Sequence, residues 1–325
     1  MPYHLGSFAE IKTSAYEAAD SLSQIYNTSG APIFLIMPLT LTVEKSCALK
    51  AEWYQECIVL PFETITVTAP AGYDEVLKVN YGDYMTPVRD TQAHDYPFGR
   101  NRSESCGMPH GAKKYEGEQI TMLTFDDSYF LGETRDGFYI EPMMKCAWAA
   151  QLEVMCVIKQ ICEKYDIPYF AYYGTLLGTI RHKGFIPWDD DMDICMLRKD
   201  YQRFLEVVPR ELTGEYHINS PYTQDKYTFV FSRILNASSI SYDPSRLSQF
   251  HRCPYIVGVD IFPLDALPTN PSEESLLNQL IHILISVVDR YDDNPEDIMA
   301  MLPELEQLCN IKLDTQRSIK INCSA

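Results

Sequence analysis

Several signals are missing from this sequence of 325 residues, and each absence excludes a class of protein. None of the ten cysteines forms a C-x-x-C pair, so neither a zinc ribbon nor a dithiol redox motif is present. No G-x-x-x-x-G-K-[ST] or G-x-S-x-G string occurs, which excludes a Walker phosphate loop and a serine hydrolase elbow. The longest late apolar stretch, residues 281–288, is interrupted by polar residues and is far shorter than the roughly 20 residues of a membrane-spanning helix.

Positive charge is also scarce. The 27 lysines and arginines face 45 acids, which gives a formal net charge of -18. Such an excess opposes nucleic-acid binding and simple adsorption to anionic lipid, but it permits a metal cation that in turn binds a phosphorylated substrate. The amino terminus lacks a basic segment followed by an apolar core, so we expect a cytoplasmic protein with reduced thiols, compatible with peripheral association at the inner membrane face.

With 46% hydrophobic residues the chain can bury a core, and its patterns predict an α/β or α+β fold in two parts. The first part, residues 1–98, has a helix at 7–26 and strands at 33–43 and 63–68. The connection is placed at 99–129, because residues 99–117 carry Gly, Ser, Lys and Arg with little periodicity. The second part, residues 130–325, has helices at 142–164, 176–181, 199–208, 273–289 and 295–308 and strands at 169–173, 192–196 and 255–261.

The densest polar signal is the run WDDDMDI at residues 188–194. Asp191 and Asp193 are two apart on a predicted strand and should project to the same side. Paired carboxylates favour a hard divalent ion, Mg²⁺ or Mn²⁺. Asp260 lies in an apolar strand, where an ionised side chain is costly unless it is paired or binds metal, so it is the predicted third ligand.

A phosphate-binding role is predicted for residues near this run. Gly174 permits close approach of the backbone and Thr175 can cap the helical turn that follows, so their amides would face a phosphate. Arg181 and Lys183 would neutralise diphosphate oxygens, with His182 in a supporting role. Trp188 is a weaker candidate for stacking on a base or sugar.

Each of these residues also has an ordinary structural explanation. A single aspartate is more often part of a solvated turn, a single basic residue is more often a surface charge, and a loop tryptophan more often anchors its own loop. Only the whole set favours a metal and phosphate site. An EF-hand is excluded because Ile194 stands where its sixth loop position requires glycine, whereas a D-x-D glycosyltransferase using a nucleotide sugar stays open.

Two strings carry a resemblance to a known family. YGTLLGTIRHKGFIPWDDDMDI, residues 173–194, closely resembles the signature of the LicD family, which is related to fukutin and fukutin-related protein. VDIFPLD, residues 259–265, resembles that family's later acidic strand. The resemblance implies a nucleotidyltransferase-like mixed sheet flanked by helices.

The resemblance further implies an activity. It points to transfer of a phospho-alcohol, typified by phosphocholine, from a cytidine diphosphate donor to a hydroxyl of a cell-surface glycan or lipopolysaccharide precursor. In that interpretation Asp191 and Asp193 hold the metal, Asp260 completes the site and assists deprotonation of the acceptor, and Gly174 and Thr175 lie under the phosphates. A non-catalytic glycan or nucleotide binding module is the alternative from another class of protein.

The order of the segments departs from the family pattern. Residues 60–63, 70, 73–74 and 81–85 resemble a segment that normally follows the acidic strand, yet here they come first. A circular permutation would explain this order, as would the tail of one domain followed by the head of another. We favour the permutation, because each part alone would leave a core incomplete.

Overall fold

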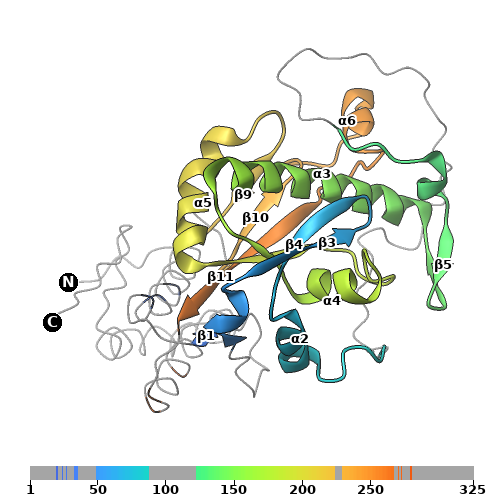
Figure 1. Cartoon of the computed structure of the whole chain (residues 1–325). Helices are drawn as coiled ribbons and strands as arrows, with labels where there is room; N and C mark the ends of the chain where they lie inside the picture. The colour runs from blue at the N-terminus through green and yellow to red at the C-terminus, as the bar shows by residue number, and fades with distance from the viewer. Residues whose placement is uncertain are drawn as a thin grey trace, which may run out of the picture.

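The computed structural model describes residues 49–87, 122–223 and 229–266, and also residues 20, 24, 27, 33–35, 270, 272 and 279 (Figure 1). The predicted helices at 273–289 and 295–308 lie outside these ranges, apart from the single residues named, and of the connection predicted at 99–129 only residues 122–129 are described. Asp20 is helical and Ile33–Leu35 is a strand, while the rest of the elements predicted at 7–26 and 33–43 lies outside.

A mixed seven-stranded sheet forms the centre of the described part of the chain, which confirms the predicted α/β class. Its backbone order is β2-β1-β11-β10-β9, with β8 paired to the other edge of β11 and β7 paired to β8. Among the described strands only β8 and β11 run parallel. The strands are β1 (Ile33–Leu35), β2 (Leu49–Lys50), β7 (Phe170–Ala171), β8 (Asp193–Leu197), β9 (His217–Asn219), β10 (Ser232–Leu235) and β11 (Gly258–Ala266).

β11 lies at the centre of the sheet, and its residues are apolar apart from Asp260 and Asp265. All but the first of its nine residues are buried, as expected for a strand covered on both sides. Two helices, α3 (Pro142–Tyr165) and α5 (Arg198–Glu211), pack against it. α3 begins at the predicted proline and ends where Asp166 adopts a left-handed conformation, with φ of 49°.

The amino-terminal segment shares the hydrophobic core of the second part. It contains η1 (Ala51–Tyr54), β3 (Cys57–Phe62), β4 (Ile65–Pro70) and α2 (Tyr73–Tyr81), and the β3-β4 hairpin lies beside β7. The ring of Tyr54 packs edge-on against Phe170 with centroids 5.2 Å apart, and Phe62 packs against Phe185 at 5.0 Å. Circular permutation stays a prediction, since it concerns the order of segments in relatives.

The strand predicted at 63–68 is wrong at its start. Glu63 and Thr64 form the turn between β3 and β4, and Glu63 has a positive φ of 47°. This conformation lets its Oε1 accept hydrogen bonds from Arg135 Nη1 at 3.0 Å and from the Phe185 amide at 3.3 Å. Contacts distant in sequence therefore override the local alternation of apolar residues.

Smaller elements complete the described structure. η2 (Asp127–Phe130) lies on α3, and the hairpin of β5 (Glu133–Arg135) and β6 (Phe138–Ile140) turns at Asp136 and Gly137, both with positive φ, as a two-residue turn requires. The described residues also form the helices α4 (Tyr173–Arg181) and α6 (Pro244–Gln249). Within the described residues, no helix combines the length and the apolar character needed to cross a membrane.

Candidate active site

Two of the predicted metal ligands lie side by side in the main sheet. Asp193 is the first residue of β8, and its register partner in the parallel pair is Asp260 on β11. Register partners on neighbouring strands point to the same face, so the two carboxylates project together. Their exposed fractions are only 9% and 7%, so both charges are largely removed from water.

A basic residue absent from the sequence-based site extends this row. Arg233 on β10 is the register partner of Asp260 on the other side of β11. Its Nε and Nη2 donate hydrogen bonds to the two oxygens of Asp260, the second at 2.5 Å. Such a two-point contact fixes the orientation of a carboxylate. Three adjacent strands thus carry the row Asp193, Asp260, Arg233.

Asp191 lies directly before β8. The strand predicted at 192–196 is observed at Asp193–Leu197, so the alternation argument that paired Asp191 with Asp193 is wrong. The two acids interact nevertheless: burial raises the pKa of Asp193, and the charge of Asp191 raises it further. Asp191 also offers an oxygen within 4.8 Å of oxygens of Asp189 and Asp190, so it links the strand acids to the preceding loop.

Asp189 is a residue of the site that the sequence analysis did not select. Burial and then the charge of Asp191 raise its pKa well above the usual range. A Cβ added to Gly174 would clash with the Oδ2 of Asp189, so a larger residue there would displace the carboxylate. The close approach that Gly174 permits is therefore the approach of a carboxylate to the first turn of α4.

Thr175 contacts the backbone of the site. The predicted strand at 169–173 and helix at 176–181 are observed as β7 and as α4 starting at Tyr173, which places Thr175 inside the helix, where it does not cap its start. Its hydroxyl is buried and accepts a hydrogen bond from the Asp193 amide at 2.8 Å. Thr175 thus ties the start of α4 to the start of β8.

Side chains of α3 hold the acidic loop by hydrogen bonds to the backbone carbonyls of the loop. Trp148 Nε1 donates to the carbonyl of Asp189 at 3.0 Å, and Gln151 Nε2 donates to the carbonyl of Asp190 at 2.5 Å. Trp148 is fully buried and stacks on Phe185 with centroids 4.6 Å apart. The loop carbonyls are therefore held from one side by a helix that is itself fixed in the core.

The predicted basic triplet lies at the other end of α4 from Gly174, a helix rise of about 10 Å away. Arg181 Nη1 donates to the carbonyl of Tyr84 at 3.2 Å, and Lys183 Nζ donates to the carbonyl of Ile180 at 3.2 Å. His182 Nε2 lies 3.0 Å from Asp136 Oδ2, and burial lowers its pKa. The structure does not bring these three side chains to the helix start.

Trp188 packs into its own neighbourhood. Its partly buried ring stands edge-on to Phe138 at 6.3 Å and to His182 at 6.4 Å. Tyr81, at the end of α2, is 40% exposed, yet partial desolvation raises the pKa of its hydroxyl, and the charges of Asp193 and Asp189 raise it further.

The donor set suits a hard divalent cation. Five aspartates gather here, and among the described residues the arginine paired with them is Arg233. They are Asp189, Asp190, Asp191, Asp193 and Asp260. Oxygen-only donors with an excess of negative charge are those that Mg²⁺ and Mn²⁺ prefer, and burial makes the uncompensated charges costly. The residues present therefore fit the predicted metal.

Comparisons with known proteins point to one family. Residues 166–270 match the family model described as "LicD/FKTN/FKRP, nucleotidyltransferase domain". The chain is 38% identical over 123 residues to the lipopolysaccharide cholinephosphotransferase LicD of Haemophilus influenzae, which is 37% of this chain and 43% of that protein. It is 41% identical over 51 residues to an uncharacterised protein of Rickettsia typhi, which is 16% of each.

The matched regions are partial. The chain spans less than half the length of the curated relatives it matches. No solved structure matches it. The family match covers α4, β8, β10 and β11, which are the elements that carry Gly174, Asp193, Arg233 and Asp260.

Proposed function

We propose that this chain, which contains a LicD-family nucleotidyltransferase domain at residues 166–270, is a metal-dependent phosphotransferase. It would transfer a phospho-alcohol such as phosphocholine from a CDP-linked donor to a hydroxyl of a cell-surface glycan or lipopolysaccharide precursor. The observation that carries the proposal is the row of Asp193, Asp260 and Arg233 across three adjacent strands. The activity for which the Haemophilus influenzae relative is named supports the choice of group and acceptor.

Asp191, Asp193 and Asp260 would hold the Mg²⁺ or Mn²⁺ ion, with Asp189 next to them. When bound, such an ion supplies charge neutralisation on the donor diphosphate. Positioning and charge compensation dominate phosphoryl transfer, so side chains held on adjacent strands of a rigid sheet suit this reaction. Thr175 contributes by fixing the Asp193 backbone through its hydrogen bond.

The bond changes in the proposed transfer are simple. The acceptor hydroxyl oxygen forms a bond to the phosphorus that carries the alcohol, and the bond from that phosphorus to the CMP oxygen breaks. The hydroxyl proton passes to a carboxylate of the cluster, and CMP leaves with the electron pair of the broken bond. Arg233 holds Asp260 in one orientation and compensates one of the five acidic charges throughout.

A donor screen tests the proposal. The protein would be incubated with Mg²⁺ or Mn²⁺, lipopolysaccharide and either CDP-choline, CDP-ethanolamine or a set of nucleotide sugars, and the released nucleotide would be separated by ion-exchange chromatography. We expect CMP from a CDP-linked donor, and its loss in excess chelator. Release of a nucleoside diphosphate from a nucleotide sugar would instead identify the D-x-D glycosyltransferase.

Two variants make the screen specific. Asp193→Ala should abolish transfer while the protein stays folded, because a ligand of the ion is lost. Glu206→Gln, an isosteric change of an exposed acid on α5, serves as the control and should leave transfer unchanged. Transfer that persists in Asp193→Ala or in excess chelator would contradict the proposal, and ligand binding without any turnover would favour the binding module.

A further inference from the structure

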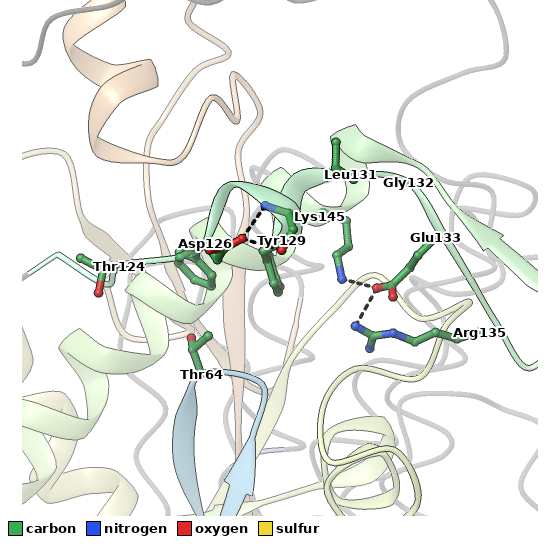
Figure 2. A pocket seen from close by; sticks show the side chains of 11 residues that line it. Thr64, Thr124, Asp126, Tyr129, Leu131, Gly132, Glu133, Arg135 and Lys145 are labelled. Atoms are coloured by element: carbon green, nitrogen blue, oxygen red, sulfur yellow. Dashed lines mark hydrogen bonds and ion pairs between the residues drawn. The ribbon is translucent and has the colours of Figure 1, made fainter.

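A second concave site lies outside the aspartate cluster. A pocket of about 410 Å³ opens between the tip of the β3-β4 hairpin, η2, β5 and the first turns of α3 (Figure 2). In Figure 2, Thr64 approaches from the hairpin, while Lys145 and Glu133 lie opposite Asp126. The volume falls within the roughly 300–1,000 Å³ of small-molecule sites. The pocket is therefore large enough for a small ligand.

The two cations that line this pocket are already paired with carboxylates. Lys145 Nζ hydrogen-bonds Oε1 of Glu133, and Arg135 Nη2 lies 2.7 Å from the same oxygen. Arg135 Nη1 also lies 3.0 Å from Oε1 of Glu63. This network holds two cations and two carboxylates, and Asp126 adds a further carboxylate to the lining, so a phosphate entering the pocket would compete with fixed carboxylates for both cations and meet additional negative charge.

The aromatic lining is likewise unsuited to a quaternary ammonium group. The Lys145 ammonium lies 4.2 Å from the centroid of the Tyr129 ring, so a cation already covers that face. A second cation there would meet direct repulsion from Lys145, whose side chain is only 3% exposed and held by Glu133. The face of the Tyr129 ring is therefore not available to the head group of a choline-type donor.

The groups that remain are those that recognise an uncharged polyol. Thr64 and Thr124 present exposed hydroxyl-bearing side chains to the lining. The Ser128 hydroxyl donates to Asp126, and the apolar Phe125 ring is part of the same lining. The carboxylate of Glu133 is 39% exposed and held in one orientation by two cations, so it is a fixed acceptor for hydroxyl groups. Sugars combine many hydroxyls with an apolar ring face, which matches this lining.

The pocket borders the proposed active site through α3. Lys145 lines the pocket, and Trp148, one turn further along the same helix, donates to the carbonyl of Asp189. We propose that the pocket binds an uncharged sugar unit of the acceptor glycan, next to the unit that receives the phospho-alcohol. The assignment of this sugar to the acceptor glycan rests on the proposed function, whereas sugar binding itself does not depend on transfer.

Equilibrium binding to the full chain tests the inference. Saturation-transfer NMR titrations would use methyl glucoside, methyl galactoside and methyl N-acetylglucosaminide as probes, without metal or donor. We expect saturable binding of at least one of them, in the millimolar range typical of a contact worth about 4 kcal/mol. Choline chloride and inorganic pyrophosphate are the competing probes and should not displace the sugar.

A filled pocket and a matched control complete the test. Thr124→Trp would occupy the pocket and should weaken sugar binding at least tenfold. Thr213→Trp introduces the same ring at another exposed threonine in an irregular segment, and should bind as the unchanged protein does. No saturable sugar binding, equal binding by both variants, or displacement by choline or pyrophosphate would each overturn the inference. Sugar binding without transfer would leave it intact and remove only the proposed activity.

Discussion

The two ends of β11 carry aspartates in opposite electrostatic settings. At one end Asp260 forms an ion pair with Arg233 and lies beside Asp193 and the other acids of the cluster. At the other end Asp265 receives two hydrogen bonds from Arg198, Nε to Oδ1 at 2.7 Å and Nη2 to Oδ2 at 2.6 Å. Arg198 also lies 2.9 Å from Asp20, and all three side chains are 3–4% exposed.

The difference separates a structural ion network from a site prepared for a ligand. The Arg198 network places one cation between two carboxylates and adds the Tyr222 hydroxyl and the Asn27 amide as donors. Among the described residues, Arg233 is the cation paired with the Asp260 end, and burial raises the pKa of both Asp193 and Asp189. Folding alone completes the first arrangement, whereas the proposed function predicts that a cation from solution completes the second.

The largest effect is expected at the structural end. Arg198→Met removes the cation from two buried carboxylates, and breaking a buried ion network by loss of one partner costs about 3–5 kcal/mol. The free energy of unfolding, measured by urea denaturation, should fall by that amount. Adding Asp20→Asn and Asp265→Asn to Arg198→Met should restore part of it, because the uncompensated charges are then gone.

A control for this prediction lies on the surface. Lys164 and Glu211 form an exposed ion pair at 2.7 Å, and Lys164→Met should leave the unfolding free energy unchanged within error. If Arg198→Met behaved like Lys164→Met, the network at Asp265 would not be a structural one.

At the Asp260 end of β11 we expect an intermediate effect of opposite sign, a gain in the free energy of unfolding. Because burial raises the pKa of Asp193 in the folded state, the metal-free folded protein binds protons more tightly than the unfolded chain. Its stability therefore falls as pH rises above the ordinary aspartate pKa of about 4. Asp193→Asn removes this penalty and should raise the unfolding free energy at pH 7 by about 0.5–2 kcal/mol in chelator.

The same comparison has a pH and a metal dependence. The gain from Asp193→Asn should shrink toward pH 4, where the aspartate of the unchanged protein is protonated as well. Addition of Mg²⁺ should also reduce it, because ligand binding stabilises the protein that retains the carboxylate. Urea denaturation across this pH range with and without Mg²⁺ measures both, and a variant less stable at pH 7 in chelator would refute the account.

The sequence was informative where one strand or helix carries the signal. The apolar period and the proline predicted α3, and an acid within an apolar strand predicted Asp260. Asp189 could not be told from its neighbours, because its role depends on the missing Cβ of Gly174, fifteen positions earlier in the sequence.

Arg233 and Glu63 show what a linear pattern leaves undetermined. Arg233 stands in the run VFSRIL, residues 230–235, where a charge in an apolar stretch was the available signal, but only the strand register places it on Asp260. Glu63 fits a strand by alternation, yet its contacts with Arg135 and Phe185 select a turn. Both depend on pairings between distant segments, which local periodicity does not encode.

The smallest effect is expected from substitution of Arg233, the arginine paired with Asp260, on the affinity for a divalent cation. Arg233→Gln removes a positive charge beside Asp260 and frees both carboxylate oxygens, so a divalent cation should bind more tightly by about 1 kcal/mol, close to fivefold. Transfer should nevertheless fall, because Asp260 loses its fixed orientation. Electron paramagnetic resonance titration with Mn²⁺ measures the first effect and CMP release measures the second.

Arg233→Lys separates charge from geometry at this position. Lysine keeps the positive charge but lacks the planar fork that contacts both oxygens of Asp260, so Mn²⁺ affinity should match the unchanged protein while transfer falls as in Arg233→Gln. Weaker Mn²⁺ binding in Arg233→Gln would mean that the arginine presents Asp260 to the cation and does not compete with it. In that case the acidic end of β11 would be preorganised by its ion pair, as the Asp265 end is, and the contrast between the two ends would be one of exposure alone.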